Sequence, residues 1–301
     1  DIGCNDGYLM GVTENYGMKS FGIDPSSAAS EALSRFPNRV INEFFSKHVV
    51  INGFSNSHSK FDLITAISMF YDVPSPVQFL DDIRQLLNSG GKIVIEVNYA
   101  KSFLEKQNID MLGQEHLVYY FIKTFEAVAL EANLFLYDAY KTDMNGGNIT
   151  FILKSEKCDK TDRLNALITE EQLYLTNFDF EGFQSKVDEK FITFKNELSR
   201  LARSKTLKIM GASTRGAFIA QYLNLDSNIF VSATDLQKNK EQRRLPGTDI
   251  AIEFDTNSNH PDIYLVMPYQ FKDEIIKRYD DFLRNGGELY FLSPEIFANI
   301  L

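Results

Sequence analysis

The sequence predicts an α/β protein with two doubly wound domains, and three observations lead to this fold class. Short apolar segments alternate with segments of helical periodicity. Glycine-rich turns at 3–7 and 211–216 each lie between such a segment and a helix. A charged stretch with helical spacing separates the two alternating regions. We therefore expect a first domain over 1–156, a helical connector over 157–203 and a second, smaller α/β domain over 204–301.

Helices and strands alternate through the first of these regions. Helical patterns cover 8–16, 26–35, 76–87 and 123–132, and the second follows the start signal Pro25-Ser26. Apolar segments predict strands over 20–23, 40–42, 61–67 and 92–97, with Gly90-Gly91 as a stop before the last. After an irregular stretch over 98–124, strands over 134–140 and 148–154 could form an antiparallel pair. The alternation predicts a mainly parallel sheet with helices on both faces.

The second region repeats this architecture on a smaller scale. Strands are expected over 207–210, 230–233, 263–267 and 288–292. Helices are expected over 217–223 and 272–283, and Gly286-Gly287 marks the end of the latter. The connector between the regions has Gly182 as its one glycine and apolar residues at helical spacing. The alternation therefore predicts a second, smaller doubly wound domain.

Composition excludes several classes of protein. The 44% hydrophobic and 24% charged residues of the 301-residue chain are typical of globular domains. No apolar run reaches the roughly 18 residues that span a bilayer, and no secretory leader opens the sequence. The net charge of −10, with dispersed acidic residues, disfavours a nucleic-acid partner. Cys4 and Cys158 lie far apart without a Cys/His cluster, which argues against a metal site and for a reducing, cytoplasmic location. Since no apolar run is long enough to span a bilayer, we expect no membrane partner.

The first glycine-rich turn predicts a cofactor site. Gly3 and Gly7 allow a tight turn before a helix N-terminus, but the spacing is GxxxG and not the GxGxxG of dinucleotide sites. A carboxylate at Asp1 would suit an amino group, which favours the methionyl end of S-adenosylmethionine. Asp24 follows Gly7 by 17 residues at the end of the next strand, where it could accept hydrogen bonds from a ribose. The alternative is a generic turn between a strand and a helix.

Three further segments raise the weight of this interpretation. They are FDLITAISMF, the helix that ends in LLNSGG, and the strand KIVIEV. Together with the turn, they predict a class I, Rossmann-like methyltransferase domain. The chain opens directly on DIGCNDG without the apolar strand that should precede such a turn. We therefore expect that a first strand, and whatever comes before it, is missing from this sequence.

The second glycine-rich turn, GASTRG over 211–216, has the arrangement that cradles phosphates with backbone N–H groups. Arg215 adds a cation. A local basic cluster follows at Lys238, Lys240, Arg243 and Arg244. We expect this region to bind the diphosphate group of a ligand through Arg215. The alternative is a structural turn beside a solvated run of charges.

In combination these segments resemble the sugar C-methyltransferase family, whose enzymes methylate C3 of nucleotide-linked 4-keto-deoxysugars. The resemblance covers the whole chain. Its specific segments are EHLVYY, DMNGGNIT, GASTRG, LPGTDIAI and PDIYLVMPYQFKDEIIKRY, while DIGCNDGYLM and FDLITAISMFYDVPSP are shared by many methyltransferases. The resemblance implies a small-molecule nucleotide-sugar substrate and S-adenosyl-L-methionine as cofactor. It also implies a zinc-binding domain before the first strand, which this sequence does not contain.

The resemblance further implies roles for individual residues. Those that match the cofactor site are Asp1, Gly3, Asn5, Gly7 and Asp24. The pair Glu115-His116 matches the Glu-His pair at the reacting sugar, where the histidine is the proposed base. Family members usually carry YHEH or CHEH, whereas Gly113 and Gln114 occupy the first two places here. A tyrosine that would help to polarise the sugar carbonyl is therefore absent.

Methylation on carbon requires a carbanion equivalent, which a 4-keto group makes accessible by acidifying the C3 proton. Histidine suits this proton transfer because it titrates near neutral pH, and a carboxylate can orient it. We therefore expect His116 to act as base with Glu115 as its partner. Tyr119 and Tyr120 either line the sugar pocket or belong to the core. Asn145, in an Asn-Gly-Gly turn, could hydrogen-bond the substrate.

Two other functions remain open at this point. Methylation of oxygen or nitrogen on a sugar or related metabolite would use the same cofactor turn but needs no enolisable ketone. A nucleotide-sugar-binding protein with a degenerate methyltransferase domain is the other alternative. The presence of Asp1, Gly3, Gly7 and Asp24 argues against degeneracy.

Overall fold

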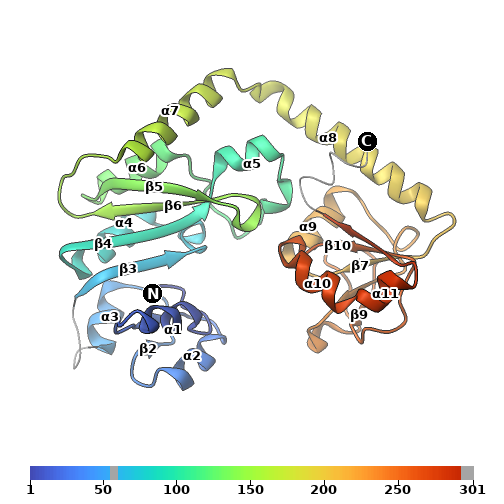
Figure 1. Cartoon of the computed structure of the whole chain (residues 1–301), viewed down its shortest axis with the longest axis horizontal. Helices are drawn as coiled ribbons and strands as arrows, with labels where there is room; N and C mark the ends of the chain where they lie inside the picture. Colours follow the sequence, from blue (N-terminus) through green and yellow to red (C-terminus); the bar gives the residue numbers. More distant parts are fainter. Residues whose placement is uncertain (55–59, 293–301) are drawn as a thin grey trace. The chain divides into compact units, whose positions relative to one another are not determined.

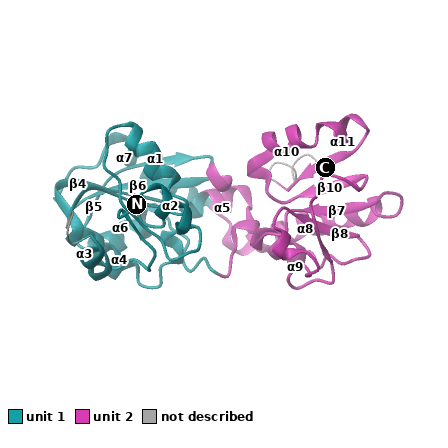
Figure 2. Cartoon of the chain, turned by 90° about the horizontal axis from the view of Figure 1, so that it is seen from below, with its two compact units in different colours: residues 1–101, 115–143, 147–177 teal, residues 102–114, 144–146, 178–301 magenta. Residues whose placement is uncertain are grey.

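The computed structural model describes residues 1–54 and 60–292. The chain divides into two compact units (Figure 2), of which unit 1 comprises residues 1–101, 115–143 and 147–177. Unit 2 comprises residues 102–114, 144–146 and the residues from 178 onward. Within the described residues, none of the helices is long and apolar enough to cross a membrane.

The sheet of unit 1 is assembled from the predicted strands (Figure 1). They are β1 (Gly22–Ile23), β2 (Val40–Ile41), β3 (Phe61–Ile67), β4 (Leu87–Asn98), β5 (Phe135–Thr142) and β6 (Asn148–Lys154). β2 pairs with β1, and β3-β4-β6-β5 form a second ladder. Ile2 makes parallel bridges to Ile23 and Ala66, so the start of the chain joins the two ladders. β6 is antiparallel to both β4 and β5, which confirms the predicted pair.

The helices of unit 1 are α1 (Tyr8–Asn15), α2 (Ala29–Arg35), α3 (Lys47–Gly53), α4 (Pro76–Leu86), α6 (Ile122–Glu131) and α7 (Asp162–Asn177). α4 begins at a proline, whose fixed φ and missing N–H suit the first helical position. Its buried side chains, Leu80, Ile83 and Leu86, recur every three residues and pack into the core of the unit. Sequence periodicity did not predict α3.

The strand β4 corrects one sequence expectation. It begins at Leu87, so Gly90 and Gly91 lie inside the strand and do not end the preceding helix. The register of β3 against β4 shifts between Phe61 and Leu63, and Gly90 has a φ of 74°. The glycine pair therefore allows an irregular pairing inside the strand. Glycine occurs at such positions as well as at helix ends.

The expected connector over 157–203 consists of two long helices, α7 and α8 (Phe180–Leu201), which belong to different units. In unit 1, the carboxylate of Glu171 on α7 is 1% exposed. It accepts hydrogen bonds from the Tyr99 hydroxyl (2.9 Å) and the Ile122 N–H (2.8 Å). In unit 2, α8 buries Val187, Phe191, Phe194, Leu198 and Leu201. Each helix is thus part of a folded unit.

Unit 2 contains the predicted second doubly wound sheet. Its strands are β7 (Leu207–Met210), β8 (Ser232–Asp235), β9 (Ile252–Phe254), β10 (Ile263–Val266) and β11 (Glu288–Phe291). They are parallel in the order β11-β10-β7-β8-β9. The helices after β7 and β10 are α9 (Thr214–Tyr222), α10 (Lys272–Arg278) and α11 (Asp280–Arg284). The helix predicted over 272–283 is interrupted at Tyr279, whose side chain is buried.

One further segment was expected to be irregular and instead contains helical turns. α5 (Ala100–Lys106) and the 3₁₀ turn η2 (Ile109–Met111) follow β4 directly. Residues 102–114 of this segment belong to unit 2, where Ile109 lies in the same core cluster as residues of α8 and α9. The chain therefore leaves unit 1 after β4 and returns to it at residue 115.

Candidate active site

The carboxyl ends of β1 and β3 bring the predicted cofactor residues together. Because Ile2 bridges both strands, the turn that follows it lies at this edge of the sheet. The Gly3 N–H donates to the Ile23 carbonyl (2.8 Å), and the Asn5 N–H donates to Asp24 Oδ2 (2.9 Å). Ligands of open α/β sheets bind at the carboxyl ends of strands. The turn and the strand-end aspartate thus form one site, as their order in the sequence predicts.

The two glycines of this turn are required by their conformation. Gly3 and Gly7 have φ values of 73° and 78°, in the left-handed region that side chains disfavour. A Cβ at Gly3 would lie 3.1 Å from Met69 Cγ, and one at Gly7 would lie 2.9 Å from Phe36 Cε2. Gly7 is also the N-cap of α1. The turn therefore leads backbone N–H groups into the start of a helix without side chains in the way.

Asp24 is 7% exposed and its carboxylate is held by the backbone. Oδ2 accepts from Asn5, and Oδ1 accepts from the Ser26 N–H (2.8 Å). Each carboxylate oxygen has two acceptor positions, so both oxygens can accept a further donor such as a ribose hydroxyl. Asp1 also keeps free acceptor positions: its Oδ1 accepts one hydrogen bond, from Thr65 Oγ1 (2.7 Å).

The segment 68–72, after β3, connects this turn to the Glu-His pair. Met69 packs against Gly3, as the 3.1 Å approach shows. Two residues further on, the Tyr71 carbonyl accepts from the N–H groups of Leu117 (2.9 Å) and Val118 (3.2 Å). The Tyr71 ring lies 4.4 Å from the His116 ring, centroid to centroid. A single short segment therefore contacts both the cofactor turn and the predicted base.

Glu115 is exposed and His116 is half-buried. A second carboxylate, Asp72, accompanies them, and its Oδ1 atom is buried without a hydrogen-bond partner. Burial raises the pKa of Asp72 to about 6, against the effect of the His116 charge and with a contribution from Glu115. The predicted base thus has two carboxylates nearby.

The two tyrosines of the EHLVYY segment lie in different surroundings. The Tyr119 ring is 6.0 Å from the His116 ring. Tyr120 is 1% exposed, stacks on Phe70 at 5.4 Å and meets Phe125 edge-on, and burial raises its pKa to about 12. Of the two alternatives that the sequence left open, pocket or core, Tyr120 has the core position, whereas Tyr119 lies beside the predicted base.

The other two predicted substrate residues, Asn145 and Arg215, belong to unit 2. Asn145 has a φ of 51° in the 3₁₀ turn η3 (Met144–Gly146). Arg215 lies in the first turn of α9, which begins earlier than predicted because the Ser213 side chain caps it through the Gly216 N–H (3.2 Å). The Arg215 guanidinium is bound to Asp110 and to the Tyr269 hydroxyl (2.8 Å).

A cavity of about 430 Å³ opens at the carboxyl ends of β7, β8 and β10 in unit 2. Its polar lining includes Ser213, Asp235, Asp255, Glu274 and Arg278. Of the predicted basic cluster, Lys240 donates to Asp235 (2.9 Å) and to the Ala212 carbonyl (3.0 Å). Arg244 donates to the Asp249 carbonyl (2.6 Å), and Lys238 and Arg243 are exposed. The second glycine turn therefore borders a cavity where a doubly wound sheet binds ligands.

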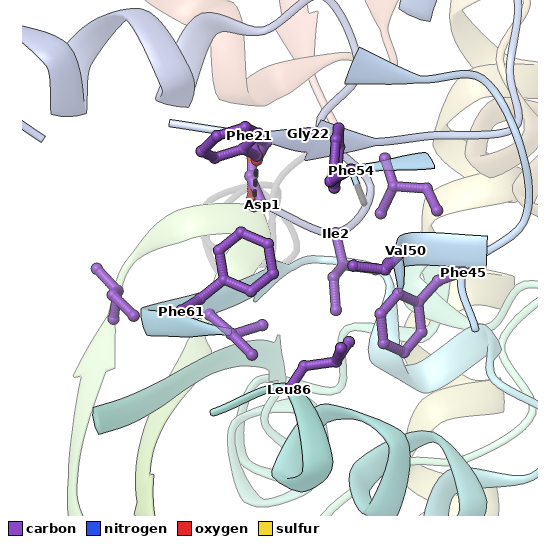
Figure 3. Close-up of a pocket in the computed structure, with 12 residues that line it drawn as sticks. Asp1, Ile2, Phe21, Gly22, Phe45, Val50, Phe54, Phe61 and Leu86 are labelled. Carbon is purple, nitrogen blue, oxygen red and sulfur yellow. Dashed lines mark hydrogen bonds between the residues drawn. The ribbon is translucent and has the colours of Figure 1, made fainter. Parts of the chain in front are cut away.

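A further pocket, shown in Figure 3, lies at the opposite edge of the sheet of unit 1. Its lining is mostly apolar and includes Phe21, Phe54, Phe61 and Leu86, but it also includes Asp1, one of the predicted cofactor residues. Phe21 precedes β1 and Phe61 is the first residue of β3, so the pocket lies at the amino ends of these strands. A charged cofactor would find few partners there, and we do not place the active site in it.

Two polar residues at these sites were not singled out from the sequence. Asp72 follows a predicted buried strand, and a carboxylate at the carboxyl end of a parallel strand is a recognisable signal. Asp110 lies in the stretch expected to be irregular, and its pairing with Arg215, 105 residues away, has no local sequence signal.

Comparison with known proteins identifies the family of the chain. A family model described as a C-methyltransferase C-terminal domain matches residues 143–294, and one described as a methyltransferase domain matches residues 1–137. C-methyltransferase NovU of Streptomyces niveus is 24% identical over 304 residues, which cover 98% of this chain and 72% of NovU.

Other matches cover smaller shares of the chain. A tRNA U34 carboxymethyltransferase of Campylobacter curvus is 29% identical over 120 residues, covering 38% of this chain and 36% of that protein. The solved structure of an S-adenosylmethionine-dependent methyltransferase from Clostridium acetobutylicum aligns with a TM-score of 0.39 at 17% identity. This alignment covers 52% of this chain and 83% of that one.

Proposed function

The chain is a methyltransferase that belongs to the C-methyltransferase family whose C-terminal domain it carries, and from this premise we propose its reaction. It transfers a methyl group from S-adenosyl-L-methionine to C3 of a nucleotide-linked 4-keto-deoxysugar. The observation that carries the proposal is the segment 68–72, which contacts Gly3 of the cofactor turn and the ring of His116.

The residues of the turn fit S-adenosyl-L-methionine. Asp24 keeps acceptor positions for the two ribose hydroxyls, and Asp1 keeps one carboxylate oxygen for the methionyl ammonium. Gly3 and Gly7 allow the turn itself, since both have positive φ and a Cβ at either position would meet a neighbouring side chain. When bound, the cofactor supplies an electrophilic methyl group.

His116 removes the C3 proton of the sugar in this scheme. The C3–H bond breaks, the proton goes to the imidazole, and the electron pair forms an enolate with the 4-keto oxygen. C3 then bonds to the methyl carbon as the carbon–sulfur bond breaks, which leaves S-adenosylhomocysteine. A general base of this kind contributes about 10²–10⁴-fold to a rate. Tyr119, whose ring is 6.0 Å from the ring of His116, contacts the sugar in this scheme.

Unit 2 would hold the nucleotide part of the substrate. Its doubly wound sheet, its glycine turn 211–216 and the cavity at the carboxyl ends of its strands support this role. Methylation on carbon is supported by the description of the family and by the name of NovU. The division of labour is therefore cofactor and base in unit 1 and nucleotide in unit 2.

Product analysis tests this proposal. The protein is incubated with methyl-¹³C-labelled S-adenosyl-L-methionine and a panel of nucleotide-linked 4-keto-6-deoxysugars, and the products are examined by mass spectrometry and ¹³C NMR. We expect one added methyl group, bonded to C3. A label on oxygen or nitrogen would exclude the enolate mechanism, and binding of both ligands without transfer would favour a binding protein.

A further inference from the structure

The environment of His116 contains a carboxylate that the sequence did not single out. We propose that Asp72 is the positioning residue for His116, holding one imidazole N–H and stabilising the imidazolium that forms when the C3 proton is taken up. This inference rests on the proposed role of His116 as base. It assigns to Asp72 the role of partner to His116, for which the sequence predicts Glu115.

The first observation is an unused acceptor. Asp72 Oδ1 is buried and has no hydrogen-bond partner. Buried polar atoms are almost always hydrogen-bonded, because desolvation without a new partner costs free energy. An exception therefore requires an explanation. A donor that engages Asp72 when the site is closed around its ligands provides one, and the imidazole of His116 is such a donor.

The second observation is the backbone register between the two segments. Tyr71, the neighbour of Asp72, accepts hydrogen bonds from the N–H groups of Leu117 and Val118, directly after His116. The Tyr71 ring packs on the His116 ring at 4.4 Å, and its hydroxyl donates to the Ser68 carbonyl (2.7 Å). Asp72 and His116 therefore lie on segments that cannot slide past each other without breaking these contacts.

The third observation concerns charge. His116 and Glu115 are the charged groups that act on Asp72, and the positive charge of His116 opposes the rise in its pKa that burial causes. Glu115 is exposed, so water screens its interaction with the imidazole. The desolvated oxygen of Asp72 interacts more strongly with a cation at a comparable distance. Asp72 is thus better suited than Glu115 to stabilise the imidazolium.

The role has a defined proton balance. The proton from C3 passes to the imidazole nitrogen that faces the sugar, while the other ring nitrogen keeps its proton and donates it in a hydrogen bond to Asp72. Asp72 stays ionised throughout. Its attraction for His116 strengthens as positive charge develops on the ring, so it lowers the barrier without binding the substrate itself.

The titration of His116 tests the inference without any sugar. NMR follows the imidazole signals of the four histidines in the protein with S-adenosylhomocysteine, and His116→Asn assigns the signal of interest. In Asp72→Asn we expect the His116 midpoint to fall by about one pH unit relative to wild type, as for removal of a nearby opposite charge. Glu115→Gln should change it less, and Asp62→Asn, at the far end of β3, should leave it unchanged. A larger change in Glu115→Gln than in Asp72→Asn would overturn the inference.

Exchange of the C3 hydrogen with solvent deuterium, measured on a nucleotide-linked 4-keto-6-deoxysugar, completes the test. Asp72→Asn should lower the exchange rate at least tenfold, with KM little changed, and Asp72→Glu should restore part of the rate. If His116→Asn exchanges as fast as wild type, the proposed function fails. If His116→Asn is inactive while Asp72→Asn keeps the wild-type rate and His116 midpoint, this inference alone fails.

Discussion

Arg215 and Asp110 form a partly buried ion pair within unit 2, with Arg215 Nε 2.9 Å from Asp110 Oδ2. Arg215 Nη2 also donates to Asp110 and to the Tyr269 hydroxyl. The side chains are 23% and 10% exposed. The pair connects the segment that follows β4 to the first turn of α9. The Arg215 guanidinium, which the sequence predicts to bind a phosphate, therefore already has a carboxylate partner.

The first prediction concerns this pair. Arg215→Met and Asp110→Asn should each lower the free energy of unfolding by about 3–5 kcal/mol, because each leaves one buried partner unpaired. The double variant Arg215→Met/Asp110→Asn should lose less than the sum of the two single variants. Urea unfolding followed by circular dichroism measures all three. An Arg215 variant that unfolds like wild type but binds nucleotide sugar more weakly would instead support the predicted phosphate contact.

The second prediction concerns the cofactor. Asp24→Ala should weaken S-adenosyl-L-methionine more than tenfold, because a hydrogen bond to a charged group contributes about 1.5–3 kcal/mol. Calorimetric titration measures the affinity, with Asp62→Asn as a matched control at the other edge of the sheet. Loss of the loop contact with Asn5 would also lower thermal stability. An affinity within twofold of wild type would remove Asp24 from the ribose site.

The third prediction is a pH-dependent gain in stability. Burial raises the pKa of Asp72 to about 6 in the folded protein, from 3.8 for an aspartate exposed to water. The folded state therefore keeps a proton that the unfolded state loses, and wild-type stability falls as the pH rises through this window. Asp72→Asn removes the penalty of about 1 kcal/mol that remains after solvent screening. Its Tm should exceed wild type by about 2–4 °C at pH 8 and match it at pH 4.

A scanning calorimeter measures this difference at both pH values. Glu115→Gln is the control, since Glu115 is exposed and should change Tm little at either pH. A gain that is equal at pH 4 and pH 8 would mean that the carboxylate charge is not its cause.

The fourth prediction separates two neighbouring glutamates on α7. Glu171→Ala leaves the Tyr99 hydroxyl and the Ile122 N–H without their buried acceptor and should cost about 1–3 kcal/mol. Glu170→Ala removes ion pairs with Lys101, which is 3% exposed, and with Lys141, which is 44% exposed; because the Glu170 carboxylate is itself 45% exposed, we expect a smaller loss than for Glu171→Ala. Chemical denaturation compares the two. Equal losses would contradict the assignment of α7 to the folded core of unit 1.

Local patterns predicted the strands that bury continuous apolar runs. β3 and β6 coincide with their predicted ranges, and the parallel sheet of unit 2 follows from its alternating segments. The cofactor site was predictable for the same reason, because glycines and a strand-end aspartate have local signals. Pairings across the chain have none. The pairing of Arg215 with Asp110, and the packing of Tyr71 on His116, depend on segments that only the folded backbone brings together.

Contacts between distant segments also decide the positions of the two tyrosines, which is why the sequence could not separate them. Tyr119 and Tyr120 are adjacent in sequence and equal in residue type, and the stacking of Tyr120 on Phe70 assigns it to the core. Gly90-Gly91 gave a misleading signal because glycines that end a helix and glycines inside an irregular strand look alike in sequence.

The most direct test of the central claim is hydrogen exchange at C3. A nucleotide-linked 4-keto-6-deoxysugar is incubated in heavy water with the protein and S-adenosylhomocysteine, so that no methyl transfer competes. We predict that the wild-type protein introduces deuterium at C3. His116→Asn should lower this exchange by about 10²–10⁴-fold with cofactor affinity unchanged. Wild-type exchange rates in His116→Asn would contradict the assignment of His116 as the base.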